Sequence, residues 1–361
     1  PMSLLRNSVR KSLFRLTGFW RPYSRLFMRS DSAFWVIAWE MREIGALAFK
    51  QGKRLAPPWL LPFTDRQCAF FGSHFDLMLN EKWFDTSLRL ATAYFHGRPG
   101  TGTVEFDICF ENLKKYHHRI HRLQVSHTAM RDIVLSSGIE SSKVFLIPIA
   151  INPSYFSPQT NVLRQRARAY FDIPQDAVVI GSFQKDGVGW GDGNEPKLPK
   201  GPDILVKVLS ILKSKLPHLF VLLSGPARGY VKAGLEKYGI PYRHYLLKEY
   251  PKISSLYHCL DLYLVTSREE GGPKSVLESM ASGVPLVTTC VGQAMDLVRH
   301  GENGWMVKNG DVDGLVSCTE YVMSHPTQTE KVVKAGLATA AENTYSAQVP
   351  LWSRFFDGFV E

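Results

Sequence analysis

The chain has 361 residues, which is too long for one compact domain and suits two domains of roughly 100–200 residues each. Its composition, with 45% hydrophobic and 21% charged residues, excludes a disordered or low-complexity protein, because such chains cannot bury enough apolar surface to fold. The net charge is +10, and residues 1–150 hold 21 Lys and Arg against 12 Asp and Glu, an excess of nine positive charges. This imbalance predicts that the first half of the chain faces an acidic surface, lipid or substrate.

The cysteines argue against a disulfide framework or a structural zinc site, because they are odd in number and never spaced as C-x-x-C. They favour a reducing compartment. No apolar run reaches the ~18 residues that a membrane-spanning helix needs, and the first residues lack the apolar core and cleavage site of a secretory signal. We therefore expect a cytoplasmic protein. The cysteines are Cys68, Cys109, Cys259, Cys290 and Cys318.

Residues 3–29 hold seven basic residues and no acidic one, and their apolar residues recur at helical spacing as far as Trp20. The pattern predicts a basic amphipathic helix that is broken near Pro22. Three interpretations are open. The helix could pack on its own domain, lie on an anionic membrane, or bind nucleic acid. The third is the weakest, because no recognised nucleic-acid-reading module is present.

The rest of the first half alternates between short apolar runs and helical patterns. The FWVIAW run at 34–39 predicts a strand, and the stretch from Arg42 to Leu55 predicts a helix. Further apolar runs occupy 75–79, 88–96, 121–126 and 143–151, with a helical pattern at 128–138 that ends at Gly138. This alternation predicts a mostly parallel α/β sheet. The turn-rich segment 152–158, with two prolines, is the predicted linker.

The second half repeats the alternation more clearly and predicts a doubly wound sheet of the nucleotide-binding type. A glycine-rich segment, 186–201, follows the first strand and could be a lid over a ligand or an ornament. The last helix would place Trp352, Phe355, Phe356 and Phe359 on one apolar face. Strands are predicted at 177–183, 220–225, 243–247, 261–267 and 285–289, and helices at 204–216, 253–260 and 275–283.

The segment SREEGGPKSVLESMASGVPLVTT, residues 267–289, carries the most chemical information. Gly271 and Gly272 allow a ligand to approach the backbone closely, and Pro273 suits the first turn of a helix. The unpaired N–H groups of that turn form an anion site suited to phosphate. Glu270 and Glu278 flank this site, so their carboxylates could accept hydrogen bonds from two sets of sugar hydroxyls.

The E-x7-E spacing, followed by GVPLV at 283–287, resembles glycosyltransferase family 4. The resemblance extends to TAYFHG at 92–97, to residues 124–158 and to VGQAMDLVRHGENGWMV at 291–307, and covers roughly residues 90–345. It implies the GT-B fold: two facing Rossmann-like domains with the active site in the cleft between them. The acceptor-binding domain would span 1–153 and the donor-binding domain 154–345. A C-terminal helix in 346–361 would cross back to the first domain.

The resemblance also implies an activity. A hexose would pass from a UDP- or GDP-linked sugar to a hydroxyl acceptor with retention of its anomeric configuration, without a catalytic metal or other cofactor. The acceptor would be a glycan, a glycolipid or a small molecule, as in cell-surface polysaccharide assembly. No nucleic-acid partner is implied. Peripheral contact with an anionic membrane, at its inner face, fits the basic first half of the chain.

Carried over residue by residue, the resemblance implies that Glu270 accepts hydrogen bonds from the donor hexose and that Glu278 accepts them from the ribose hydroxyls. Lys200, in a Lys-Gly pair, would stabilise the departing diphosphate. The family's arginine position falls at Ser182 or Phe183, so we assign its role to Lys185. His96 would contact the donor sugar or the leaving phosphate. The remaining donor contacts that the resemblance implies are Ser182, Gly271, Gly272, Pro273, Lys274 and Ser275, and the base would bind near 246–250.

Some of these assignments have an alternative in which the residue has only a structural role. Glu278 and Lys274 lie four residues apart and could form a surface ion pair on one helix. His96 could be a histidine satisfied at a sheet end. Three histidines at 117, 118 and 121 suggest a metal cluster by number, but no further ligand completes one. Two other functions stay open: a UDP-sugar epimerase of the same fold, which would consume donor without acceptor, and a non-enzymatic protein that binds membrane or glycan.

Overall fold

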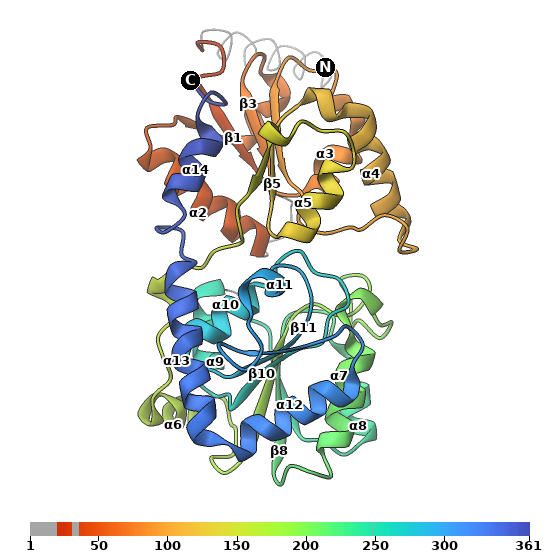
Figure 1. Ribbon diagram of the computed structural model, residues 1–361, viewed down its shortest axis with the longest axis vertical. Coiled ribbons are helices and arrows are strands. Elements are labelled where there is room, and N and C mark those ends of the chain that lie inside the picture. The colour runs from red at the N-terminus through yellow and green to blue at the C-terminus, as the bar shows by residue number, and fades with distance from the viewer. Residues whose placement is uncertain (1–19, 31–35, 248) are drawn as a thin grey trace, which may run out of the picture. The chain divides into compact units, whose positions relative to one another are not determined.

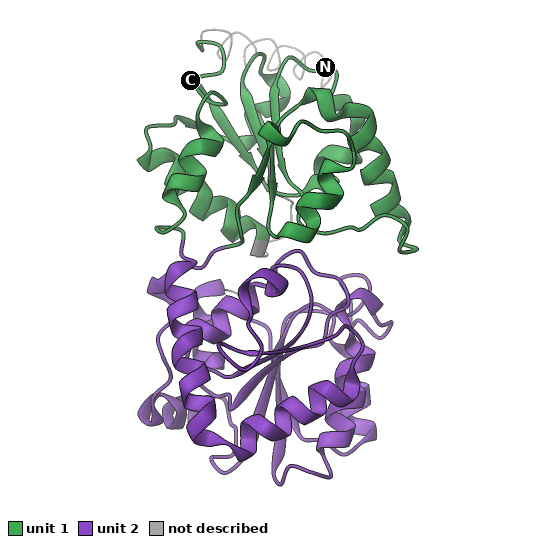
Figure 2. Ribbon diagram, in the orientation of Figure 1, with its two compact units in different colours: residues 1–149, 345–361 green, residues 150–344 purple. Residues whose placement is uncertain are grey.

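The computed structural model describes residues 20–30, 36–247 and 249–361. It divides into two compact units (Figure 2). Unit 1 comprises residues 1–149 and 345–361, and unit 2 comprises residues 150–344. Each unit is built on its own six-stranded sheet, in which every pair of neighbouring strands is parallel (Figure 1).

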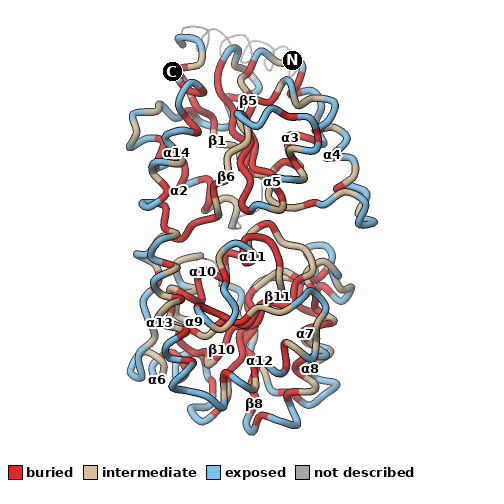
Figure 3. Tube along the Cα trace, in the orientation of Figure 1, coloured by how far each residue is buried: buried red, intermediate tan, exposed pale blue. Residues whose placement is uncertain are grey.

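The sheet of unit 1 has the strand order β2-β1-β3-β4-β5-β6. Its buried strands and the inner faces of its helices form an apolar core that includes Phe27, Phe71, Leu90 and Leu123, and Figure 3 shows these strands as the buried centre of the unit. The strands are β1 (Leu26–Arg29), β2 (Leu55–Ala56), β3 (Cys68–Phe71), β4 (Arg89–Ala93), β5 (Ile120–Val125) and β6 (Val144–Leu146). The helices are α2 (Val36–Lys50), α3 (His74–Met78), α4 (Val104–Tyr116), α5 (Thr128–Leu135) and α14 (Val349–Phe356).

The strand predicted from FWVIAW is wrong where the structure describes it. Residues 36–39 open helix α2, whose buried side chains Met41, Ile44 and Ala48 recur at spacings of three and four. A short apolar run does not distinguish a buried strand from the first turn of a buried helix, and the longer helical period that follows decides the structure here. Residues 34 and 35 lie outside the described residues.

The helix predicted over 3–29 is wrong at its C-terminal end. Residues 1–19 lie outside the described residues, but Leu26–Arg29 forms β1. Leu26 and Phe27 are both fully buried, and β1 pairs with β2 on one side and β3 on the other. A strand that is buried on both faces lacks the alternation of apolar and polar residues that would reveal it. The pattern of the basic stretch therefore predicted a helix where β1 forms.

The last helix, α14, belongs to unit 1. Trp352, Phe355 and Phe356 are completely buried, and the Phe355 ring packs against Phe70 of β3 at a centroid distance of 5.2 Å. Phe359 lies beyond the end of the helix and is also fully buried, so the predicted apolar face continues into the following turn.

The sheet of unit 2 has the order β12-β11-β10-β7-β8-β9. The chain therefore runs outward from β7 to one edge and then returns to β10, on the other side of β7, before running to the opposite edge. The strands are β7 (Val178–Phe183), β8 (Leu219–Ser224), β9 (Tyr242–Tyr245), β10 (Leu262–Val265), β11 (Leu286–Thr289) and β12 (Trp305–Val307). The predicted doubly wound sheet is confirmed.

Helices pack on both faces of this sheet and bury two apolar clusters, one that includes Val179 and Leu277 and one that includes Leu205 and Leu264. The helices are α6 (Asn161–Tyr170), α7 (Pro202–Leu212), α8 (Gly229–Lys237), α9 (Ile253–Tyr257), α10 (Lys274–Ala281), α11 (Ala294–Leu297), α12 (Val312–Ser324) and α13 (Pro326–Glu342).

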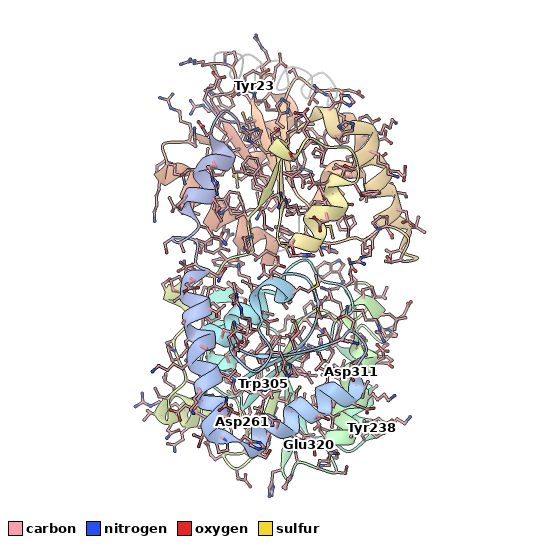
Figure 4. The ribbon with its side chains drawn as sticks, viewed as in Figure 1. Tyr23, Tyr238, Asp261, Trp305, Asp311 and Glu320 are labelled. Atoms are coloured by element: carbon pink, nitrogen blue, oxygen red, sulfur yellow. The ribbon has the colours of Figure 1, made fainter. Side chains whose placement is uncertain are left out.

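Asp261, labelled in Figure 4, ties helix α6 to the start of β10. Its carboxylate pairs with Arg164 at 2.5 Å and with Arg168 at 2.8 Å, and it also accepts a hydrogen bond from the Val179 amide. The Arg168 side chain is fully buried, so this charge is compensated by direct pairing. The first helix of unit 2 is thereby fixed on the sheet.

Among the residues that the structure describes, no helix combines the length and the apolar composition needed to cross a membrane.

Candidate active site

The candidate site lies at the point where the strand order of unit 2 reverses. β7 and β10 are neighbours in the sheet, but the connections after them lead to opposite edges. In doubly wound sheets ligands bind outside the carboxyl ends of the strands at this point. The loops that begin after Phe183 and Val265 therefore hold the candidate residues.

Lys200 and Glu270 meet at this edge. The Lys200 Nζ lies 2.5 Å from Glu270 Oε2, and the Ser267 hydroxyl donates to Glu270 Oε1 at 2.9 Å. Gln184 donates to the Lys200 carbonyl at 3.1 Å and accepts from Ser267 at 3.4 Å. The predicted lysine and the predicted carboxylate are thus held together by residues from both loops.

Lys185 lies beside this pair. Its pKa is lowered, first by burial and second by the positive charge of Lys200, so the two ammonium groups act on each other electrostatically. The Lys185 Nζ lies 4.4 Å from the centroid of the Trp190 ring. In the part of the chain that the structure describes, Lys185 forms no ion pair with a carboxylate. A partly buried cation without a counter-charge is suited to an anionic ligand.

Gly201 shapes the turn that presents Lys200. Its φ is +64°, and a Cβ on this residue would lie 2.0 Å from the Thr266 carbonyl oxygen. The Thr266 hydroxyl also donates to the Gly201 carbonyl at 3.0 Å. A residue with a side chain therefore cannot enter this turn unless the backbone after β10 moves.

Replacing Gly201 with alanine is expected to lower the free energy of unfolding by more than about 2 kcal/mol, because a left-handed backbone and a backbone clash act together. Gly239→Ala is the matched control. Gly239 has φ +61° but no heavy atom within 4 Å of a built Cβ, so only the left-handed penalty of about 1 kcal/mol applies. Denaturant titrations of both variants measure the difference. Equal losses would show that the contact with Thr266 is unimportant.

Gly271, which follows Glu270, packs against the loop that follows β11. The Gln293 amide donates to the Gly271 carbonyl at 3.2 Å, and a Cβ on Gly292 would lie 2.7 Å from the Glu270 carbonyl oxygen. Helix α10 begins at Lys274, so Pro273 is the residue before the helix and not a member of its first turn. Ser275 lies in that first turn, in which the Val276 amide donates to the Pro273 carbonyl at 2.9 Å.

Glu278 is buried in the second turn of α10. Its carboxylate accepts hydrogen bonds from the hydroxyls of Tyr250 and, at 2.9 Å, Tyr257. Burial raises the pKa of Glu278, and the two tyrosine hydroxyls and Lys274 oppose the rise. The interpretation of Glu278 and Lys274 as a surface ion pair is wrong, because the exposed fractions of the two residues are only 3% and 7%. The Lys274 Nζ instead lies 5.5 Å from the centroid of the Tyr250 ring.

Ser182, at the end of β7, lies in a different environment. Its side chain is buried, and its hydroxyl accepts a hydrogen bond from Arg228 at 3.1 Å. Arg228 is itself fully buried and pairs with Asp186 at 2.9 Å. The predicted contact between Ser182 and a donor stays a prediction.

His96 belongs to unit 1, whereas the other predicted site residues belong to unit 2. It follows β4 and packs against Phe75, Phe106 and His74, at ring centroid distances of 5.5, 5.8 and 5.7 Å. His74 follows β3 and stacks on Tyr94 at 3.9 Å. An aromatic cluster therefore surrounds the predicted histidine at the carboxyl edge of the first sheet.

His74 makes the stability of unit 1 dependent on pH. Burial lowers its pKa well below 6.5, and the neighbouring His96 lowers it further. The unfolded chain therefore binds a proton below about pH 6.5 that the folded chain excludes, and stability falls as the pH falls. We expect a loss of about 1.4 kcal/mol between pH 7.5 and 5.5 from this group.

Denaturant titrations at both pH values measure this loss, with His74→Phe as the variant that should remove it. His118→Phe, at an exposed histidine, is the control that should leave the pH dependence unchanged. Burial also lowers the pKa of His121 and His244, so part of the dependence should survive in His74→Phe. An identical pH dependence in His74→Phe and the wild type would contradict this account.

Sequence reasoning missed the residues that hold the predicted ones in place. Tyr257 and Tyr250 are 21 and 28 residues from Glu278, and Gln184 is 83 residues from Ser267. No spacing pattern connects such partners. The strand end at Phe183 was predicted from the sequence, and a search of the loop after it would have found Gln184. The strand predicted over 261–267 ends at Val265 in the structure, so Ser267 was hidden at the end of a predicted strand.

Within residues 20–30, 36–247 and 249–361, no group of three or more His, Cys, Asp or Glu side chains is placed to hold a metal ion.

The family comparison adds to this geometry. Residues 196–338 match the family described as glycosyl transferases group 1. The matched region contains Lys200, Glu270 and Glu278.

Curated relatives that match this chain include two proteins named as glycosyltransferases. The lipopolysaccharide core biosynthesis mannosyltransferase LpsB of Rhizobium meliloti is 27% identical over 206 residues, which cover 49% of this chain and 59% of LpsB. The D-inositol 3-phosphate glycosyltransferase of Thermomonospora curvata is 24% identical over 246 residues, which cover 62% of this chain and 54% of that enzyme. The chain spans about half the length of the curated relatives it matches.

Solved structures share the fold of both units. Anabaena HepE in complex with UDP-glucose matches with a TM-score of 0.73 at 14% identity, over 92% of this chain and 99% of HepE. Sucrose-phosphate synthase from Thermosynechococcus elongatus matches with a TM-score of 0.65 at 16% identity, over 81% and 73% of the two chains. The predicted GT-B fold is confirmed as two Rossmann-like domains, and the predicted active site in a cleft between them stays a prediction.

Proposed function

We propose that this chain is a retaining glycosyltransferase that moves a hexose from a UDP- or GDP-linked sugar to a hydroxyl acceptor. One observation carries the proposal: Lys200 is paired with Glu270 at 2.5 Å, beside Lys185, at the strand-order reversal of a doubly wound sheet. A sugar nucleotide placed there would present its diphosphate to cations and its hexose to a carboxylate.

The two lysines would assist departure of the nucleoside diphosphate. Breaking the bond between the anomeric carbon and the phosphate oxygen leaves negative charge on the diphosphate. Ammonium groups fixed beside that oxygen stabilise this charge without reorganising. The N–H groups in the first turn of α10 add a partial positive charge. In this proposal Lys185 and Lys200, and not a metal ion, supply the positive charge.

The two carboxylates would orient the donor. Glu270 would accept hydrogen bonds from hexose hydroxyls, and Glu278 from the ribose hydroxyls. A carboxylate has about four acceptor sites, so the two tyrosine bonds to Glu278 leave capacity for a ribose. In the same proposal, backbone amides around Gly272, Lys274 and Ser275 hold the diphosphate.

His96 would contact the donor sugar or its leaving phosphate during transfer. The acceptor hydroxyl would attack the anomeric carbon on the face from which the diphosphate departs and pass its proton to the departing phosphate oxygen. This route retains the anomeric configuration without a covalent glycosyl-enzyme. Trapping of a covalent sugar on any side chain would contradict this route.

The acceptor would be a glycan, glycolipid or small molecule. LpsB is named for lipopolysaccharide core biosynthesis, which supports a glycan or glycolipid. The excess of nine positive charges in residues 1–150 supports an anionic acceptor or a peripheral contact with the inner face of an anionic membrane. The free cysteines among the described residues fit the cytoplasmic location that we propose.

The test is turnover of a donor panel by the full chain. UDP-glucose, GDP-mannose, ADP-glucose and dTDP-glucose are incubated with the protein, and release of the nucleoside diphosphate is measured. We expect slow hydrolysis of a UDP- or GDP-linked donor, with the first-formed free sugar, observed by proton NMR, in the anomeric configuration of the donor. Inverted sugar would contradict retention. An epimerised sugar nucleotide formed without acceptor would contradict transfer.

A further inference from the structure

The loop between β7 and α7 is closed at its base. An isolated antiparallel bridge joins Gly187 to Pro196, the Val188 amide donates to the Glu195 carbonyl at 2.9 Å, and the Lys197 amide donates to the Asp186 carbonyl at 2.8 Å. We call residues 186–197 the anchored loop. It is rich in glycine, but the bridge and these hydrogen bonds hold its two ends together.

The anchored loop is docked on the turn that precedes α8. The amides of Gly229 and Tyr230 donate to the carbonyls of Asp192 and Gly193, at 2.7 and 2.9 Å. A Cβ on Gly193 would lie 2.3 Å from the Ala227 carbonyl oxygen, so the two backbones touch. Glycine is required at this position for the close approach.

A buried ion pair fixes the start of the loop. Arg228 and Asp186 are both fully buried, with Arg228 Nε 2.9 Å from Asp186 Oδ1. The same guanidinium donates to the carbonyls of Ser182 and Ser224, at 2.7 and 2.9 Å. One side chain therefore joins the ends of β7 and β8 to the residue that directly follows Lys185.

The anchored loop places an aromatic ring next to the Lys185 ammonium group. Trp190 is 64% exposed, and its ring lies 4.4 Å from the Lys185 Nζ. A cation on the face of an indole ring is attracted to the negative quadrupole of that ring. Lys185 is thus held from two sides: its backbone by the anchored Asp186 and its ammonium group by Trp190.

We propose that the anchored loop is a positioning element in which Trp190 holds the Lys185 ammonium ready for the diphosphate of a nucleotide ligand. This inference rests on the proposed function and adds to it a residue, Trp190, that acts only through Lys185. Trp190 shields one side of the ammonium group from water and restricts a flexible four-carbon side chain, so less conformational freedom is lost when the anion binds.

A double-mutant cycle tests the inference. Trp190→Ala, Lys185→Met and the double variant are made in the full chain, and the affinities for UDP, GDP, ADP and dTDP are measured by calorimetry. For the nucleotide that binds the wild type, we expect Trp190→Ala to weaken affinity about fivefold and Trp190→Phe, which keeps an aromatic face, to restore most of it. In the Lys185→Met background the loss of Trp190 should change affinity by less than about twofold, because coupled residues are not additive.

A loss of the same size in both backgrounds would overturn the inference, because Trp190 would then act independently of Lys185. So would an unchanged affinity in Trp190→Ala. Trp59→Ala removes an equally exposed tryptophan, 62% against 64%, and should leave binding unchanged. Glu278→Ala separates the two proposals. If a nucleotide binds the wild type and needs Glu278 but not Trp190, only the loop inference fails; if none binds the wild type, both fail.

Discussion

Glu278→Gln is expected to stabilise the ligand-free protein while it removes most of the affinity for nucleotide. The wild-type carboxylate is 3% exposed, and burial raises its pKa above the ordinary 4.5. The folded protein therefore holds a proton that the unfolded chain releases above pH 4.5, and stability falls as the pH rises through the folded-state pKa. The neutral amide removes this cost, which we expect to be on the order of 1 kcal/mol at pH 7.

The same substitution damages binding, because an amide offers one acceptor oxygen where the carboxylate offers two. Both tyrosine hydroxyls already donate at this position, so the ribose would lose its partner. We expect the affinity for the preferred nucleoside diphosphate to fall by at least tenfold, a loss typical of hydrogen bonds to charged groups.

Denaturant titration of the ligand-free proteins and calorimetry with the nucleotide measure the two effects. Glu302→Gln, at an exposed glutamate of unit 2, is the control and should change neither quantity. A variant that is less stable and still binds nucleotide normally would show that Glu278 serves only the packing of α10 against Tyr250 and Tyr257.

Lys200→Met is expected to reduce kcat for donor hydrolysis by about 10²–10³-fold, the usual loss when a fixed group that stabilises developing negative charge is removed. The ammonium group lies 2.5 Å from Glu270, so the variant also leaves this carboxylate with only Ser267 as a described hydrogen-bond partner. Affinity for the free nucleotide should fall less than kcat, because the charge on the leaving group is largest in the transition state.

Initial rates of nucleoside diphosphate release, measured over a range of donor concentrations, separate kcat from KM. Lys207→Met removes an exposed lysine from helix α7, close in sequence to Lys200, and should keep wild-type rates. An unchanged kcat in Lys200→Met would remove this lysine from the mechanism and leave Lys185 as the cation that assists departure.

The architecture of unit 2 could be predicted because its signals are local. Its strands are short apolar runs ended by glycine or polar residues, and its helices keep a clear apolar period, as in 204–216. The first elements of unit 1 could not be predicted in the same way. β1 is buried on both faces, and α2 begins with an apolar run that a strand would also show. Only pairing with β2 and β3 settles the first case.

In the candidate site, too, residues close together in the sequence could be predicted and distant ones could not. Glu270, the two glycines and Glu278 lie within nine residues, so their spacing reveals them. Their supports come from other loops: Lys200 is 70 residues from Glu270, and Arg228 is 46 residues from Ser182. The closeness of Lys200 to Glu270 results from β7 and β10, which are neighbours at the reversal of the sheet, and only the strand order discloses this.

Thermal unfolding with UDP, GDP, ADP and dTDP, for the wild type and for Glu278→Ala, tests most directly whether unit 2 holds a nucleotide-sugar site. A ligand present at 100 times its dissociation constant adds about 2.7 kcal/mol to the free energy of unfolding. We predict that UDP or GDP raises the unfolding temperature of the wild type and that Glu278→Ala responds much less. If no nucleotide stabilises the wild type, or if the variant responds equally, the assignment of this site is contradicted.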